Sequence, residues 1–573
     1  MAFSDAVLAH ARQHVGRTLY VFTPNERKAL APFFTNVDRS VFFMFTLPQS
    51  VGDVLFAMYS RMKNPRGVRG VFVDSFLPLF LAITLRETRE SCGGDPERFI
   101  RERKIASLED FLGASDEARG AFADFLRAFS VDPKYITTFS TTEKVKRFLS
   151  LFLDRYGHNS IARMAGGIWI GFEQISILAA KSIEWGRPGS GYIELSTRYV
   201  DMGGKDLYPI ADELALCGVA PGKVAKVIDA CFDAYRTLQG ERFSGPLPSY
   251  LREAYGALYQ GFPKDLDAGV IGETCDVLGN FLPAATLTSV GVCVSGEALP
   301  GLIKHLMLDR APETIALAEA LVEESSILGY DQFLRHMEIA PWDECHWTYL
   351  APEPFAPERA PKVIVMERDA QVRDALVRAF EDSHPAVETF DDVLALLART
   401  ERGAFDKLPH QFEYFTAAFR GVMSFRGWRD LQRMGFCTHH RTYLTPTIGF
   451  YRYDKPVPFE LYGASAALIH GLNKAIFQDM ADAGVPAALM QYPLALGNLV
   501  GFHIGANLRE WEFCIWQRGD YSVNHEVRVV FLSIDRSLRT LYPWWGDLSR
   551  GDTTPAYVFA RGGKAIPLAP QGM

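Results

Sequence analysis

The sequence predicts a mixed α/β protein made of two domains, and three observations support this. A chain of 573 residues is too long for a single ordinary hydrophobic core. Its content of 48% hydrophobic and 22% charged residues is typical of a soluble globular protein. Segments with helical spacing and strand-like segments occur on both sides of a proline-rich stretch at 341–362. Each domain is therefore expected to combine helices and strands.

Charge and cysteine usage narrow the class of function. The formal net charge is -8 and the chain has no long lysine or arginine block, which argues against nucleic-acid binding. Any nucleotide bound by this protein is therefore expected to be small. The 8 cysteines are scattered without a Cys-x-x-Cys pair, which is typical of a reducing compartment rather than of a disulfide framework.

The N-terminal part of the chain contains no recognisable targeting or membrane segment. The N-terminus lacks a charged start followed by an apolar stretch, so we expect no signal peptide. The most apolar run, Gly70 to Leu85, carries Asp74 and Pro78 and is shorter than a membrane span. We expect a cytoplasmic protein that contacts no membrane.

A glycine-rich segment at 185–199 resembles a nucleotide-binding loop. Glu194, Ser196 and Arg198 alternate along it, so in an extended strand their side chains leave from one face. A guanidinium group donates two parallel hydrogen bonds to a phosphate, and a nearby carboxylate keeps it oriented. A surface ion pair on a strand edge is the plainer interpretation, but the glycines that precede the three residues favour a nucleotide loop.

The elements around the proline-rich stretch set the domain boundary. Helical spacing with a Glu, Ala and Leu composition covers 314–326 before it and, over a shorter length, 374–381 after it. The apolar run at 363–366 is expected to begin a strand. We assign residues 1–345 to the first domain and residues 346–573 to the second.

A weak internal repeat runs across this boundary. The segment 282–294 resembles 492–504, with Pro, Ala, Val and Gly recurring at an offset of 210, as in the pairs Pro283 and Pro493 or Gly291 and Gly501. Each copy follows a basic, aromatic segment, 185–199 in the first half and 428–443 in the second. A gene duplication is the simplest explanation.

Together these segments resemble the flavin-dependent thymidylate synthase family, in a long form with two copies of that fold. The Glu194-Leu195-Ser196-Thr197-Arg198-Tyr199 element is the most specific match, followed by Asn507-Leu508-Arg509. The resemblance implies two tandem α/β domains of the thymidylate-synthase-complementing type. It also implies methylation of dUMP, or of a related pyrimidine nucleotide, at C5 with FAD as cofactor. Methylenetetrahydrofolate would supply the carbon and NADPH the hydride.

The resemblance also implies roles for individual residues. Catalytic roles fall to Arg198, Arg433 and Arg518, which would stabilise charge on the pyrimidine. The implied contacts to a dUMP-like substrate are Glu194, Ser196, Arg198, Gln432, Arg433 and Arg518. The implied contacts to FAD are His158, Ser160, Arg187, Glu413, Asn507 and Arg509. Because single-copy members assemble their sites from several subunits, the resemblance implies a homodimer that acts as a pseudo-tetramer.

The sequence departs from the family pattern in both halves. The family's Arg-His-Arg triplet reads Gly186-Arg187-Pro188 in the first half and Arg433-Met434-Gly435 in the second. Arg163 stands where a glutamate is expected, and Ser295-Gly296-Glu297 replaces Asn-x-Arg. These losses leave a second hypothesis open, in which the protein is a catalytically silent nucleotide-binding or scaffold protein.

Plainer interpretations exist for several of these residues. Asn507 is also a suitable helix cap, and Arg509 could pair with Glu510 or Glu512 on a helix surface. The segment Cys437-Thr438-His439-His440 contains metal-binding residue types. Adjacent histidines rarely point at one ion, however, and no second Cys/His pair follows at the spacing of a zinc finger. We therefore expect no metal.

Overall fold

The structure is a computed structural model, and it forms two compact units. It describes residues 5–47, 55–56, 59, 64–129, 167–184, 189–197, 201–204, 206–335, 337–340, 343, 349–357, 360–398, 402–403, 406–453, 455–560 and 564–568. Unit 1 comprises Met1–Ser196, Asp206–Pro209 and Thr286–Trp347, and unit 2 comprises Thr197–Lys205, Ile210–Ala285 and Thr348–Met573. A segment of the first half of the sequence thus belongs to the unit built from the second half. The repeat boundary at residue 345 stays a prediction.

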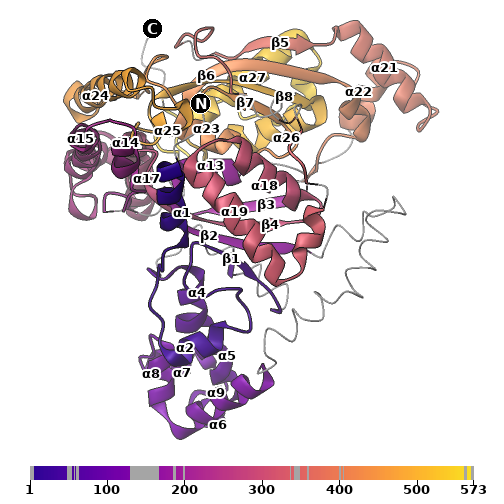
Figure 1. Ribbon diagram of the computed structural model, residues 1–573. Helices are drawn as coiled ribbons and strands as arrows, with labels where there is room; N and C mark the ends of the chain where they lie inside the picture. The colour runs from indigo at the N-terminus through magenta and orange to yellow at the C-terminus, as the bar shows by residue number, and fades with distance from the viewer. Residues whose placement is uncertain are drawn as a thin grey trace. The chain divides into compact units, whose positions relative to one another are not determined.

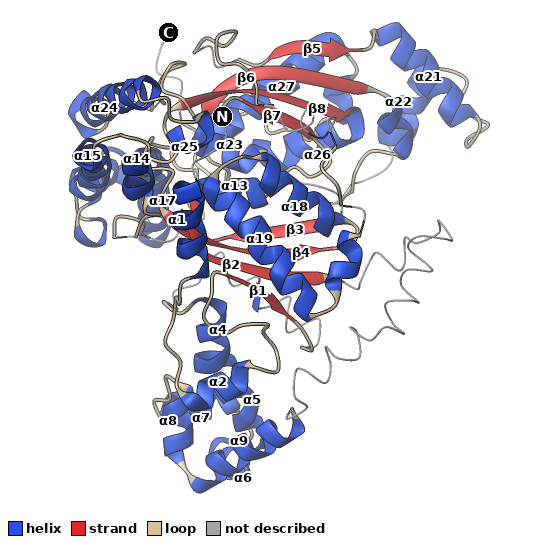
Figure 2. Ribbon diagram, in the orientation of Figure 1, coloured by secondary structure: helices blue, strands red, loops and turns tan. Residues whose placement is uncertain are grey.

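Unit 1 is built around a four-stranded antiparallel sheet with the strand order β1-β2-β4-β3 (Figure 1). Its elements are α1 (Asp5–Gly16), α2 (Pro24–Leu30), β1 (Val41–Met44), α4 (Gly67–Val71), the π-helix η2 (Phe72–Phe76), α5 (Leu77–Thr84), α6 (Arg86–Cys92), α7 (Pro96–Glu102), α8 (Leu108–Ala114), α9 (Asp116–Ala128), β2 (Ile168–Ser176), α13 (Ile177–Ile183), β3 (Ser190–Glu194), β4 (Leu287–Val294), α18 (Ala298–Leu308), α19 (Pro312–Ile327) and η7 (Tyr330–Leu334). Helices α1, α18 and α19 cover one face of the sheet (Figure 2). Aliphatic side chains from these helices and from β2 and β4 form the core between the two layers.

The helices α4, η2 and α5 form one continuous apolar stretch over Gly67–Thr84. Its length of 18 residues and its apolar composition would allow it to cross a membrane. The apolar run identified from the sequence, Gly70 to Leu85, is shorter because it starts three residues later. Of this stretch, 61% is buried inside the protein, as in the core helix of a folded domain. Arg69, fully buried at its start, forms an ion pair of 2.8 Å with Glu173 of β2.

Unit 2 has a second four-stranded antiparallel sheet with the equivalent order β5-β6-β8-β7. Its elements are α14 (Ile210–Leu216), α15 (Pro221–Gln239), η4 (Glu241–Phe243), α16 (Pro246–Tyr255), η5 (Gly256–Tyr259), α17 (Pro263–Leu278), η6 (Gly279–Phe281), β5 (Lys362–Met366), α21 (Asp369–Glu381), α22 (Phe390–Ala398), η8 (His410–Tyr414), β6 (Thr416–Ser424), α23 (Phe425–Leu431), β7 (Thr438–Arg441), η9 (Phe459–Leu461), α24 (Gly463–Asp482), α25 (Ala487–Met490), β8 (Leu499–Asn507), α26 (Leu508–Gly519), α27 (His525–Leu541) and α28 (Trp545–Leu548). Both halves therefore mix helices and strands, as the sequence predicted.

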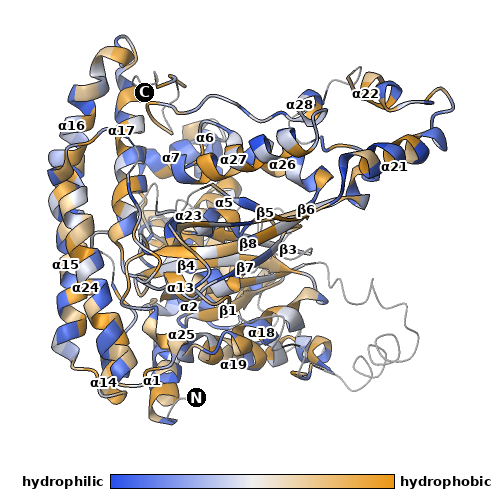
Figure 3. Ribbon diagram, turned by 90° about the horizontal axis from the view of Figure 1, so that it is seen from above, coloured by the Kyte–Doolittle hydropathy of each residue, from blue (hydrophilic) through white to orange (hydrophobic). Residues whose placement is uncertain are grey.

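Helices α15 and α24 of unit 2 lie side by side in both views (Figures 1 and 3). Each carries hydrophobic and hydrophilic residues along its length, so one face packs and the other meets solvent (Figure 3). A salt bridge of 2.8 Å between Lys223 and Asp479 joins them at the surface. Proline at the first turn starts α15, α16 and α17, where the missing N–H costs no hydrogen bond.

The two sheets repeat the same local construction, which supports the predicted duplication. At the end of β2, Ser176 caps α13, and its N–H and Oγ donate to Glu313 at 2.8 and 2.6 Å. At the end of β6, Ser424 caps α23 and donates in the same way to Glu526. Each glutamate lies at the start of the long helix that closes its copy, α19 or α27.

The register of the repeat differs from the predicted offset of 210. Ser176 pairs with Leu287 and Ser424 with Leu499, so Leu499 is the counterpart of Leu287 and the offset is slightly longer than predicted. The reciprocal bonds from Ala284 N–H to the Leu494 carbonyl and from Leu496 N–H to the Leu282 carbonyl follow the same register. The identities at the shorter offset were misleading because buried strands draw on a small set of aliphatic and small residues.

The predicted elements near the boundary are confirmed. The segment 314–326 lies within α19, 374–381 lies within α21, and 363–366 lies within β5. Of the segment 194–198 that the sequence predicts to be extended, only Glu194 lies in a strand, since β3 ends there; residues 195–197 lie outside the strand, and Arg198 lies outside the described residues.

Candidate functional site

Two arginines predicted to contact the substrate, Arg433 and Arg518, come together in unit 2. Arg433 follows α23, and Arg518 lies in the last turn of α26. Burial, followed by the positive charge of Arg433, lowers the pKa of Arg518 from 12.5 to about 10. The Nε of Arg518 is buried and has no hydrogen-bond partner among the described residues. A buried guanidinium donor within electrostatic reach of a second arginine is an arrangement that favours an anionic ligand.

Gln432, the third predicted substrate contact of unit 2, directly precedes Arg433 in the sequence and is buried. It is 4% exposed, and its backbone N–H donates to the carbonyl of Trp428, which closes α23. The helix end therefore fixes the position of Gln432, and of Arg433 after it.

Helix α26 presents a line of polar side chains at intervals of four residues. Glu510, Cys514 and Arg518 share one face of the helix because i, i+4 and i+8 positions lie nearly above one another. The core face of the same helix carries Trp511 and Ile515, both fully buried. Helix α26 thus joins the predicted anion site to two further ionisable groups that the sequence analysis did not single out.

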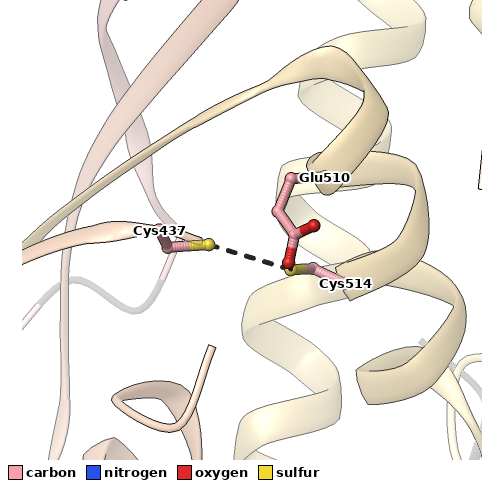
Figure 4. Close-up of side chains that lie close together, drawn as sticks. All are labelled: Cys437, Glu510 and Cys514. Atoms are coloured by element: carbon pink, nitrogen blue, oxygen red, sulfur yellow. Dashed lines mark hydrogen bonds between the residues drawn. The ribbon is translucent and has the colours of Figure 1, made fainter. Parts of the chain in front are cut away.

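A compact group of three side chains lies along this line (Figure 4). The Sγ atoms of Cys437 and Cys514 are 3.8 Å apart, and the Sγ of Cys514 is 3.6 Å from Oε1 of Glu510. Lys407 donates to the other carboxylate oxygen of Glu510 at 2.5 Å. All three side chains are buried, and burial raises the pKa of the Cys514 thiol well above its ordinary value.

Two predicted FAD contacts, Glu413 and Arg509, also come together in unit 2. Arg509 Nη1 donates to Glu413 Oε1 at 2.6 Å, and His410 contacts the same oxygen at 2.9 Å. Burial raises the pKa of Glu413, but the hydrogen bonds from His410 and Arg509 outweigh it and hold that pKa below its ordinary value. The plainer expectation that Arg509 pairs with Glu510 or Glu512 is wrong, because Lys407 and Arg550 take those carboxylates.

The helix-cap interpretation of Asn507 is confirmed. Its Oδ1 accepts a hydrogen bond of 2.8 Å from the N–H of Glu510 and so starts α26. In the register of the two sheets its counterpart is Ser295, whose Oγ accepts from the N–H of Ala298 at 3.1 Å. Ser295-Gly296-Glu297 is therefore the counterpart of Asn507-Leu508-Arg509, as predicted.

The predicted substrate loop of the first half is only partly described. Glu194 is buried at 3% exposure and accepts from Lys181 Nζ at 2.7 Å, while Glu184 contacts the same ammonium group. The carboxylate is thus held by a buried lysine of α13 that the sequence analysis missed. Ser196 follows β3 and is half-buried. The other predicted residues of this half, His158, Ser160, Arg187 and Arg198, lie outside the described residues, as does Arg163.

A cavity of about 550 Å³ lies elsewhere in unit 2. Its lining includes Met423, Tyr451, Arg452 and Glu526 from β6, a loop and α27. The volume is in the usual range for small-molecule pockets. None of the predicted site residues lines it.

Three proteins that are similar to this chain in sequence are each named UPF0159 protein. The one from Chlamydia muridarum is 25% identical over 508 residues, which cover 82% of this chain and 85% of the relative. Those from Chlamydia pneumoniae and Thermoplasma acidophilum are each 26% identical and cover 53% and 52% of this chain, and 48% and 67% of the relatives. No family model matches the chain.

Two solved structures are also similar over part of the chain. Both are of a UMP/dUMP methylase, PolB, from Streptomyces cacaoi, one bound with 5-Br dUMP and the other with 5-Br UMP. They share 14% and 12% sequence identity with this chain and cover 33% of it, and 93% and 94% of their own chains. The TM-scores are 0.27 and 0.26.

Proposed function

We propose that unit 2 binds the phosphate of a pyrimidine nucleotide between Arg433 and Arg518. On this proposal the protein methylates dUMP, or a related pyrimidine nucleotide, at C5 with FAD as cofactor. Methylenetetrahydrofolate supplies the carbon and NADPH the hydride. The observation that carries the proposal is the pair of arginines, in which the Nε of Arg518 is buried with no partner among the described residues.

The electrostatics of this pair favour an anionic ligand. Two guanidinium groups near one another repel, and the repulsion is strongest where burial removes water. A phosphate placed between them converts the repulsion into two attractions and gives the Nε of Arg518 an acceptor. Lys407 contacts the other end of α26, where Glu510 neutralises its charge, so this lysine does not compete with the arginine pair for the anion.

The residues at the start of α26 fit an FAD phosphate in part. The N-terminus of a helix favours anions because its first N–H groups are free of intrahelical partners. Arg509 there uses Nε and Nη1 for Leu408 and Glu413, and its side chain is 25% exposed. No hydrogen bond joins its Nη2 to another described residue, which leaves that group for a diphosphate. A bound flavin would supply the hydride-transfer chemistry.

The chain's own side chains hold and polarise the nucleotide in this proposal. Arg433 and Arg518 orient the phosphate and stabilise negative charge that develops on the pyrimidine. Gln432, held at the end of α23, supplies an amide for the base. Glu194, Ser196 and Arg198 of the first half complete the substrate contacts, and His158, Ser160 and Arg187 complete those to FAD. A homodimer that acts as a pseudo-tetramer is part of the proposal.

The absorption spectrum of the purified full-length protein tests the proposal. We expect a flavin spectrum, or one that forms after incubation with FAD, and a change in it when dUMP is added. Arg433→Ala should lose the dUMP response and keep flavin, Arg509→Ala should lose flavin first, and Arg536→Ala, an exposed arginine of α27, should change neither.

One result would contradict the flavin part of the proposal, and another would refute the whole of it. A colourless protein that still binds dUMP would instead support a silent nucleotide-binding protein, which the broken Arg-His-Arg triplets of both halves also favour. A protein that binds neither FAD nor dUMP would refute the proposal.

A further inference from the structure

The Cys437, Glu510 and Cys514 group lies outside the residues that the proposed nucleotide chemistry uses. Cys437 comes from the segment that precedes β7, while the other two come from α26. The two cysteines are 77 residues apart in the sequence, so the fold rather than local spacing brings their sulfurs together. Their exposed fractions are 7% for Cys437, 0% for Cys514 and 4% for Glu510.

Two of the distances within the group match the edges of a tetrahedral metal site. With Zn–S bonds of about 2.3 Å, two sulfurs of a tetrahedron lie about 3.8 Å apart, and a sulfur and a carboxylate oxygen about 3.5 Å apart. The observed separations are 3.8 Å between Cys437 and Cys514 and 3.6 Å between Cys514 and Glu510. All three ligand atoms lie within 4.8 Å of one another, close enough for one metal ion to contact all three (Figure 4).

The charges around the group also suit a divalent cation. Glu510 accepts from Lys407 through Oε2, which leaves Oε1 turned toward Cys514. Two thiolates, one carboxylate and a divalent ion together carry one negative charge, which the Lys407 ammonium neutralises. The thiol protons leave to solvent when the metal binds, so the buried group stays neutral overall with its ion.

The first copy of the fold shows that packing does not require these polar residues. In the register of the two sheets, the helix equivalent to α26 is α18, and its matching positions are Ala298, Leu302 and Leu306. Leu302 is 2% exposed and Leu306 is fully buried. The same helix face is thus aliphatic in unit 1 and carries Glu510, Cys514 and Arg518 in unit 2. A polar line in one copy, where the other copy is apolar, indicates that the second copy keeps these residues for a function rather than for packing.

We propose that Cys437, Cys514 and Glu510 bind a divalent metal ion of the zinc class in unit 2. Thiolate and carboxylate donors in a four-coordinate arrangement favour Zn²⁺ among the common metals. Among the described residues no fourth His, Cys, Asp or Glu joins the group, so its fourth position takes a water molecule or an oxygen atom of a ligand. This replaces the expectation from sequence that Cys437 belongs to no metal site.

Metal binding is tested on the full-length protein in reducing buffer, apart from any activity. We expect about one equivalent of zinc per chain after gel filtration. Titration of the chelator-treated protein with Co²⁺ should give sulfur-to-cobalt charge-transfer absorption and the intense visible bands of tetrahedral Co²⁺. Cys437→Ala and Cys514→Ala should lose these bands. Glu510→Gln, which keeps the size of the side chain, should weaken Co²⁺ binding by at least about tenfold.

Cys217→Ser provides the matched control, because that thiol is only partly buried and lies in the same unit. It should bind Co²⁺ like the unaltered protein. The wild-type titration decides the proposal even where a variant fails to fold. Absence of both zinc and Co²⁺ binding by the reduced wild-type protein would overturn it. A metal-free disulfide between Cys437 and Cys514 that binds no Co²⁺ after reduction would overturn it as well. Since neither FAD nor dUMP enters the assay, its outcome is separate from that of the proposed function.

Discussion

Replacing Arg518 by leucine is expected to stabilise unit 2 and to weaken its binding of a phosphorylated nucleotide. The first copy already places a fully buried leucine, Leu306, at the matching position of α18, so the fold accommodates this side chain. The substitution removes a guanidinium that burial and Arg433 both disfavour. Arg518→Leu therefore tests whether the wild-type arginine lowers the stability of the folded protein while it raises the affinity for a phosphorylated nucleotide.

The size of the stability gain follows from the pKa of Arg518. That pKa falls from 12.5 to about 10, and at about 1.4 kcal/mol per pKa unit the charged form costs about 3 kcal/mol in the folded protein. Because solvent reaches part of the side chain, we expect a gain of about 1–3 kcal/mol. The folded-state pKa is the lower one, so the cost is fully present at neutral pH and fades only above about pH 10.

Urea unfolding of the full-length protein at neutral pH measures this gain. Tryptophan fluorescence reports on unit 2, since Trp511 of α26 is fully buried in it. Arg509→Leu on the same helix serves as the control: its guanidinium is partly exposed and paired with Glu413, so the change should stay within about 1 kcal/mol. An Arg518→Leu protein that is less stable than wild type by more than about 1 kcal/mol would refute the reasoning, because Arg518 would then be satisfied by the protein itself.

Three further predictions concern buried polar groups that stabilise each unit. Glu526→Gln replaces a carboxylate that accepts from the N–H and Oγ of Ser424, so it should lower the free energy of unfolding by about 2 kcal/mol in urea; a loss below about 0.5 kcal/mol would show that the cap is not charge-assisted. Glu173→Gln leaves the fully buried Arg69 without its counter-charge and should lower the free energy of unfolding by about 3–5 kcal/mol. A variant that melts at nearly the same temperature as the wild-type protein would contradict this. Burial, followed by the charge of Arg17, lowers the pKa of His14 to about 3. The free energy of unfolding should therefore fall as the pH drops below about 6.5, by about 2 kcal/mol at about pH 5. His14→Phe should remove this acid sensitivity, and a variant with the wild-type pH profile would exclude His14 as its source.

Local patterns in the sequence predicted the elements that depend on local chemistry. Helical spacing located α19 and α21, and the apolar run located β5. The helix cap that the sequence offered as the plainer interpretation of Asn507 is of this kind, because a cap needs only a side-chain oxygen and the N–H group three residues on.

Those local patterns did not predict contacts between segments that are distant in the sequence. Arg509 pairs with Glu413, 96 residues away, rather than with its neighbours on the helix. The register of the repeat depends on sheet pairing, which includes an irregularity in β2 near Gln174 that spacing alone does not reveal. Of the metal group, the sequence offers only the four-residue spacing of Glu510 and Cys514, which the sequence analysis did not single out; the approach of Cys437 required the fold.

Calorimetric titration with dUMP and with deoxyuridine measures whether Arg518 holds the phosphate of a nucleotide. A charge-assisted contact is worth about 1.5–3 kcal/mol, so wild-type protein should bind dUMP about 10- to 100-fold more tightly than deoxyuridine. Arg518→Leu should reduce this preference by about tenfold or more, with Arg433 as the remaining cationic contact. If Arg518→Leu keeps the wild-type preference for the phosphorylated ligand, Arg518 does not contact the phosphate and the account of the site is wrong.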